Sequence, residues 1–170
     1  MSPPMYDASV PVFNRVLTNL AAILAKAEAW ATERKIVPEA LLQARLAPDM
    51  FTLTRQVQIA TDMAKGTCGR LAGAEIPRHE DNETSFAQLI ERVERTRAFI
   101  NGLPAAAFEG AETRQISLKV GPPDKQRTLE FVGRDYLLGW GTPNLYFHYS
   151  MVYALLRHNG LAIGKNDYLG

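Results

Sequence analysis

The chain has 170 residues, the size of one domain, and 46% of them are hydrophobic, which excludes a disordered or low-complexity chain. Its 19 Lys and Arg residues nearly balance its 18 Asp and Glu residues. A nucleic-acid-binding protein usually carries a basic excess, so we expect no nucleic-acid partner. The single cysteine, Cys68, excludes an internal disulfide and is typical of a reducing compartment.

The N-terminal segment 1–7 has neither the basic nor the apolar region of a signal peptide. The longest apolar stretches, such as 20–25, are far shorter than the roughly 20 residues that a membrane span needs. We therefore expect a cytoplasmic protein without membrane contacts.

Three segments have the spacing of amphipathic helices. Within 10–31, apolar residues recur every three or four positions, and a second stripe beside the first predicts a helix that contacts two neighbours. A short helical turn is expected over 38–42. The same rhythm predicts a second long helix over 53–71, ending before Gly73, and a third over 86–100.

The period of the pattern changes to two after the third helix. Residues 116–120 alternate between apolar and polar, a Gly-Pro-Pro-Asp turn follows, and alternation resumes at 129–131, which predicts a β-hairpin. A last helix is expected over 133–159, interrupted at Pro143 and closed by Gly160. The sum is an all-α four-helix bundle, a single domain over 1–170, with a small β-hairpin inserted before the last helix.

One face of the last helix contains a histidine among apolar residues. This face consists of Leu145, His148, Val152, Leu155 and Asn159. Asn144 precedes His148 by one turn, and two side chains in that relation can hold one ligand or metal ion between helices. The alternative is a buried neutral His148 that is hydrogen-bonded to Asn144 or to a tyrosine such as Tyr149 or Tyr153.

The second helix offers one polar candidate for the bundle interior. A helical wheel places Gln56 about 60° from the centre of the apolar face. The same wheel places Gln58, Asp62 and Lys65 on the solvent side. Gln56 is therefore the candidate for the bundle interior, the alternative being a border residue whose amide reaches water.

Several remaining residues have simpler interpretations. His79 lies in a polar loop beside two acids and is expected in solvent, while Cys68 is expected to pack as a small apolar residue. The segment 136–153 is rich in aromatic residues, which could line a pocket or a dimer face. Trp140 and Tyr149 are the candidates for the pocket.

Segments 5–13, 45–51, 55–62 and 153–160 resemble an uncharacterised family, the domain of unknown function numbered nineteen ninety-three, within the DinB/YfiT-like superfamily. The resemblance covers essentially the whole chain, including 164–170. It implies an up-down-down-up four-helix bundle that is often dimeric, so we expect a homodimer.

The resemblance also implies a metal site with three histidines, which some superfamily members use for thiol-dependent transfer or isomerisation. Only His148 keeps its histidine here, because the other two positions fall on Asn144 and on or near Gln56. Amide oxygens are weak ligands for zinc compared with imidazole. We therefore expect a degenerate site with no metal ion, or with a weakly bound Zn²⁺ or Ni²⁺.

Three functions follow as hypotheses. The first is a metal-free or weakly metal-binding protein, with a small molecule held among Gln56, Asn144, His148, Tyr149 and Trp140. The second is a transferase or isomerase that depends on a divalent metal and a thiol, with His148 as metal ligand or general base. The third is a purely structural dimerisation module in which His148 is buried and hydrogen-bonded.

Overall fold

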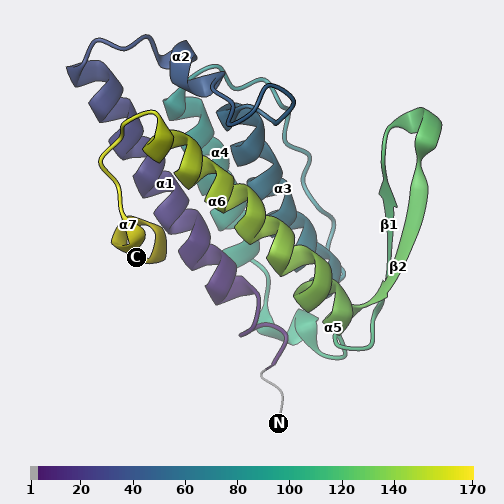
Figure 1. The fold of residues 1–170 in the computed structure, drawn as a ribbon. Coiled ribbons are helices and arrows are strands. Elements are labelled where there is room, and N and C mark those ends of the chain that lie inside the picture. Colours follow the sequence, from purple (N-terminus) through teal and green to yellow (C-terminus); the bar gives the residue numbers. More distant parts are fainter. Residues whose placement is uncertain (1–3) are drawn as a thin grey trace.

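The computed structural model describes residues 4–170, which fold mostly into helices (Figure 1). Four long helices pack against one another: α1 (Val10–Glu33), α3 (Leu53–Ala72), α4 (Phe86–Asn101) and α6 (Thr142–His158). The short helices are α2 (Pro38–Leu42), α5 (Gly133–Tyr136) and α7 (Lys165–Leu169). The predicted long helices and the short turn at 38–42 are confirmed. The terminal helix α7 was not predicted.

Helix α1 has the wide apolar face that its two stripes predict. It packs mainly against α4 and α7, and its side chains at Leu17, Leu20 and Ile23 are fully buried. Ser9, at the N-cap position of α1, makes no side-chain cap hydrogen bond, because its hydroxyl donates to the Met5 carbonyl oxygen at 2.6 Å.

Helices α3 and α4 begin at side-chain caps. The Thr52 hydroxyl accepts from the Arg55 amide at 3.3 Å, and the Ser85 hydroxyl accepts from the Gln88 amide at 3.2 Å. Helix α3 ends at Gly73, which has a φ of +66°, a left-handed conformation that glycine adopts without strain.

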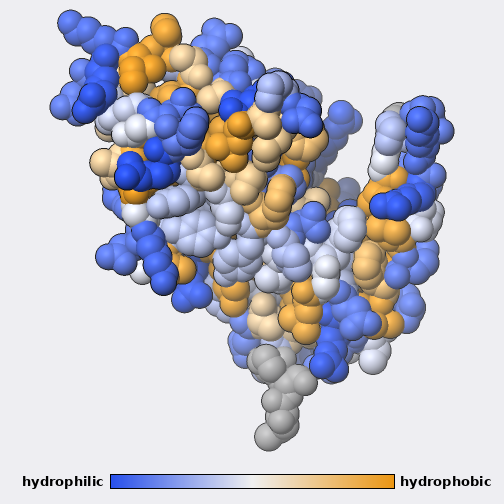
Figure 2. All heavy atoms as spheres, viewed as in Figure 1, coloured by the Kyte–Doolittle hydropathy of each residue, from blue (hydrophilic) through white to orange (hydrophobic). Residues whose placement is uncertain are grey.

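The hairpin consists of β1 (Gln115–Val120) and β2 (Arg127–Val132), paired antiparallel with Leu118 opposite Leu129. It projects from the end of the bundle beside α5 (Figure 1), and its apolar residues gather on the side toward the bundle (Figure 2). Leu118 is buried, and the Phe131 ring packs on Trp140 at 5.8 Å. The predicted hairpin is confirmed.

The last helical segment is interrupted by a π-helical turn over Leu137–Gly141, just before Pro143. The turn lets the backbone of Gly141 approach Thr67 on α3 closely. A Cβ atom added at Gly141 would lie 2.5 Å from the Thr67 hydroxyl oxygen, whereas one added at Gly139 would meet nothing within 4 Å. The contact between α3 and α6 therefore requires glycine at position 141.

We predict that Gly141→Ala lowers the free energy of unfolding by about 1–3 kcal/mol, because the added methyl group overpacks the contact with Thr67. Gly139→Ala is the matched control, expected to be neutral or to stabilise by up to about 1 kcal/mol through helix propensity. Urea denaturation of both variants measures the difference. Equal midpoints would contradict the close packing of α3 and α6 at Gly141.

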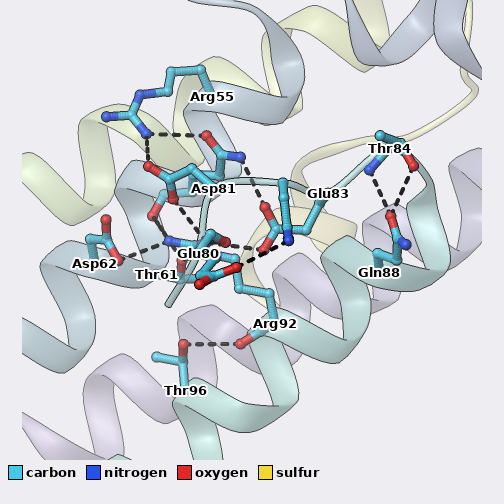
Figure 3. Close-up of polar contacts among 12 residues, drawn as sticks. Arg55, Thr61, Asp62, Glu80, Asp81, Glu83, Thr84, Gln88, Arg92 and Thr96 are labelled. Carbon is cyan, nitrogen blue, oxygen red and sulfur yellow. Dashed lines mark hydrogen bonds and ion pairs between the residues drawn. The ribbon is translucent and has the colours of Figure 1, made fainter. Parts of the chain in front are cut away.

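A fully buried arginine holds the segment between α3 and α4 (Figure 3). The Arg92 guanidinium lies 3.0 Å from carboxylate oxygens of Asp81 and Glu83 and 2.9 Å from Asp62. It also donates to the Thr61 hydroxyl at 2.7 Å and to the Glu80 carbonyl oxygen at 2.9 Å. Arg92 thus connects α4 both to α3 and to the segment that follows α3.

The neighbours of Arg92 correct the predicted solvent face of α3. Gln58 and Lys65 are buried, and Asp62 is half-buried. The Gln58 amide donates to Glu83 at 2.9 Å, and the Lys65 ammonium donates to Asp62 at 2.7 Å. These polar side chains face α4 and the segment 79–83 rather than water.

Glu83 is ionised within this cluster. Burial by itself would raise the pKa of its carboxyl group, but hydrogen bonds from Gln58 and Arg92 outweigh burial and hold the pKa below its ordinary value. Because the folded-state pKa is depressed, Glu83 stabilises the fold above its unfolded-state pKa. That contribution is lost as the pH falls through the folded-state pKa.

We predict that Arg92→Met lowers the free energy of unfolding by about 3–5 kcal/mol, since it leaves the buried Glu83 carboxylate without its cation. Arg95→Met, on the same helix at an exposed position, is the matched control and is expected to change stability by less than about 0.5 kcal/mol. Guanidinium denaturation compares the two variants. The account of Arg92 is wrong if both have the same midpoint.

Candidate functional site

The structure brings together two of the predicted site residues, Gln56 on α3 and His148 on α6. The Gln56 Oε1 and His148 Nδ1 atoms lie 2.7 Å apart, although the residues are 92 positions apart in the chain. Both are buried, with 2% of Gln56 and 8% of His148 exposed. Gln56 therefore faces the bundle interior, and His148 is its hydrogen-bond partner.

This hydrogen bond fixes the chemical state of His148. A carbonyl oxygen only accepts, so Nδ1 carries the proton and Nε2 keeps its lone pair. Burial, reinforced by the nearby positive charge of Arg55, lowers the pKa of His148 to about 4. The imidazole is therefore neutral at pH 7, and among the described residues its Nε2 has no partner and is not enclosed.

A hollow of about 240 Å³ opens beside this pair. It is lined by Asp49, Met50, Phe51, Gln56, Phe147 and His148. The Phe147 ring stands edge-on to the His148 ring at 5.1 Å, and Phe147 and Phe51 are both about half exposed. We call this hollow the His148 pocket.

One wall of the His148 pocket is the loop before α3. The Leu53 amide donates to the Ala44 carbonyl oxygen at 3.0 Å and closes the base of the loop. The Arg45 guanidinium reaches across the loop and donates to the Met50 carbonyl oxygen. These contacts position Asp49, Met50 and Phe51 opposite α6.

The structure places the other predicted site residues elsewhere. The Asn144 amide donates to the Trp140 carbonyl oxygen at 2.8 Å, one turn earlier in its own helical segment. The Trp140 ring packs on Phe131 of the hairpin. Tyr149 is buried and donates to the Tyr168 carbonyl oxygen at 2.8 Å, on the side of α7. Only Gln56 and His148 share a site.

His79 differs from its predicted place in solvent. It is half-buried, and its Nδ1 atom is enclosed without a hydrogen-bond partner among the residues described. Burial, followed by the positive charges of Lys65, Arg92 and Arg95, lowers its pKa to about 4. The loop that carries His79 packs against α3 and α4 through the Arg92 cluster, which sequence periodicity did not predict.

The residues at the His148 pocket do not fit the three-histidine metal site implied by the superfamily. His148 supplies one imidazole nitrogen, whereas the Gln56 carbonyl oxygen already accepts the Nδ1 proton and the Asn144 amide is turned to Trp140. Asp49 adds one carboxylate to the lining. Within 4–170, no three His, Cys, Asp or Glu side chains are grouped closely enough to hold a metal ion.

Sequence reasoning missed the wall of the pocket that the loop before α3 supplies. Phe51 and Met50 belong to a loop, where helical periodicity gives no information about direction. Phe147 lies on the outer side of α6, next to His148, and half of its surface is exposed. Phe147 belongs to the aromatic-rich segment 136–153, which was predicted to line a pocket or a dimer face, although Phe147 was not singled out.

The bundle and its inserted hairpin define a DinB-like helical protein. A crystal structure of a DinB family member protein from Shewanella denitrificans is similar to this chain, with 40% sequence identity and a TM-score of 0.85. The similarity covers 98% of this chain and 92% of that chain. The model of the family called domain of unknown function, DUF1993, matches residues 5–169. The chain therefore belongs to the DUF1993 family.

One further comparison and one property of the helices bear on the function. No curated protein matches the chain significantly. Among the helices of residues 4–170, none combines the length and apolar character needed to cross a membrane.

We predict that His148 titrates with a midpoint near pH 4 and holds its proton on Nδ1 at neutral pH. Nitrogen-15 NMR of the imidazole measures both. Gln56→Glu replaces the neutral acceptor with a carboxylate and should raise the midpoint toward or above the ordinary value of about 6.5. A wild-type midpoint at or above 6.5 would contradict the environment described for His148.

The lowered pKa of His148 also predicts the direction in which the stability of the fold changes with pH. The unfolded chain takes up a proton on His148 near pH 6.5, whereas the folded chain does so only near pH 4. The free energy of unfolding should therefore fall as the pH is lowered through this window. His79 contributes in the same direction and over the same window.

Proposed function

We propose that the His148 pocket binds a small organic molecule without a resident metal ion. The observation that carries this proposal is the 2.7 Å hydrogen bond from His148 Nδ1 to Gln56 Oε1. It leaves Nε2 of a neutral imidazole as a fixed hydrogen-bond acceptor. A fixed polar group beside apolar walls is the usual composition of a ligand site.

The walls limit the kind of molecule that fits. Met50, Phe51 and Phe147 favour an apolar or aromatic body, and the His148 Nε2 lone pair favours a hydroxyl or N–H donor on that body. The volume of about 240 Å³ lies below the roughly 300–1,000 Å³ of pockets for drug-sized ligands. The ligand is therefore compact.

The metal- and thiol-dependent transferase is less well supported. A zinc centre of the catalytic kind uses three strong protein ligands, and the pocket offers one imidazole and one carboxylate. The metal-free hypothesis requires only the donor and acceptor atoms that line the pocket.

A second copy of the chain is the alternative occupant of this face. Phe51 and Phe147 expose 51% and 53% of their surface beside the pocket, and homodimer formation would cover them.

The up-down-down-up order of the four long helices is also part of this proposal. Support for that order comes from Arg92 beside Thr61 and Phe99 beside Gly69, a parallel pairing of α4 and α3.

Phenol and anisole test the proposed function as probes that share a ring and differ in the hydroxyl donor. Titration followed by amide NMR should shift signals of residues 49–51 and 147–148 with phenol. Anisole should bind about threefold to tenfold more weakly, because it cannot donate to Nε2. His148→Phe keeps an aromatic ring and should abolish the preference for phenol.

His158→Ala, at an exposed position near the end of α6, is the matched control and should leave the preference unchanged. Circular dichroism checks that His148→Phe is folded. Equal binding of phenol and anisole, or shifts confined to other parts of the chain, would overturn the proposal. Sedimentation velocity of the same samples shows whether ligand binding competes with a dimer.

A further inference from the structure

A second stripe of aromatic residues runs along α6, away from His148. Tyr146, Tyr149 and Tyr153 are spaced three or four residues apart, and Ser150 is four residues after Tyr146 and three before Tyr153, so all four share one side of the helix. Figure 2 shows residues of intermediate polarity gathered where α7 lies against α6. This side of α6 is not used by the His148 pocket.

Tyr168 of α7 fixes the far wall of this region. Its ring stacks on Tyr149 at 4.3 Å and meets the Tyr153 ring edge-on at 5.7 Å. Its carbonyl oxygen accepts from the Tyr149 hydroxyl at 2.8 Å and from the Asn19 amide at 3.1 Å. Helix α7 is therefore anchored on both α1 and α6.

A hollow of about 260 Å³ lies between these elements, lined by Ser150, Tyr153, Lys165 and Tyr168. The Ser150 and Tyr168 hydroxyl oxygens are 2.8 Å apart. Whichever hydroxyl donates to the other, the second hydroxyl keeps its own hydrogen for an outside acceptor. The pair thus always presents one O–H donor.

The charge around this hollow is positive. No carboxylate lines it, and Lys165 is exposed and has no acidic partner among the described residues. The nearest acid in the sequence, Asp167, is engaged by the Lys26 ammonium and the Gly164 amide. A bound anion would therefore meet an ammonium group and a hydroxyl donor, and no carboxylate among the residues that line the hollow.

We propose that this hollow is a second binding site, which accepts a small aromatic anion. The carboxylate or a similar oxyanion would contact Lys165 and the free hydroxyl of the Ser150–Tyr168 pair, and the ring would pack on Tyr153. The site is independent of the His148 pocket, since the two share no lining residue.

Benzoate and benzamide test this site as probes of equal shape and different charge. Amide NMR should place benzoate at residues 150, 153 and 165–168, with benzamide binding about threefold to tenfold more weakly. Lys165→Gln should weaken benzoate binding by a similar factor and leave benzamide unchanged. Lys119→Gln, at an exposed position of the hairpin, is the matched control.

Tyr153→Leu should weaken both probes, because it removes the ring on which they pack. Raising the salt concentration should weaken benzoate only, since exposed ion pairs are screened. The proposal is overturned if benzamide binds as well as benzoate, if Lys165→Gln has no effect, or if neither probe shifts these residues. Phenol binding at the His148 pocket is unaffected by any of these results, so the two proposals fail separately.

Discussion

Arg92 is a permanent cation without exposed surface, and burying such a charge is costly unless carboxylates and hydrogen-bond acceptors surround it. Asp62 comes from α3, whereas Asp81 and Glu83 come from the segment between α3 and α4. The guanidinium can be satisfied only when these elements meet. The chain between the two helices is thus held in place by charge rather than by regular secondary structure.

This constraint extends to the candidate site through α3. The Arg55 guanidinium donates to Gln58 at 3.1 Å and pairs with Asp81, so it belongs to the same polar cluster as Arg92. The next residue, Gln56, points to the other side and binds His148. Helix α3 therefore carries a charged face toward α4 and a neutral hydrogen-bonding group toward α6. The charge of Arg55 also favours the neutral form of His148.

The sequence predicted the parts of the fold that depend on local periodicity. The long helices, the hairpin and the end of α3 before Gly73 follow from residue spacing and from one glycine. The contact of Gln56 with His148 was accessible in the same way, because both were placed near the bundle interior by their wheels. The elements and the inward direction of each residue follow from local sequence, whereas the contact itself depends on the packing of α3 against α6.

The parts that sequence reasoning missed depend on tertiary contacts. Gln58 and Lys65 look like solvent residues on the wheel of α3, but the segment around Glu83 covers that side. Asn144 lies one turn before His148 on the regular helix α6, as its spacing predicts, but its amide does not turn to the histidine. The π-helical turn precedes α6, and the Asn144 amide instead satisfies the Trp140 carbonyl oxygen. Tyr149 was predicted for a pocket, but α7, absent from the predicted elements, covers it.

We propose that His148 serves as a neutral hydrogen-bond acceptor rather than as a metal ligand. Elemental analysis of untagged protein purified without chelators tests it most directly, with Zn, Ni, Mn, Fe and Cu measured per chain alongside His148→Ala. The account predicts less than about a tenth of an equivalent of each metal, even after reloading with Zn²⁺ or Ni²⁺, because one imidazole and one carboxylate bind such ions weakly. About one equivalent that disappears in His148→Ala would contradict it.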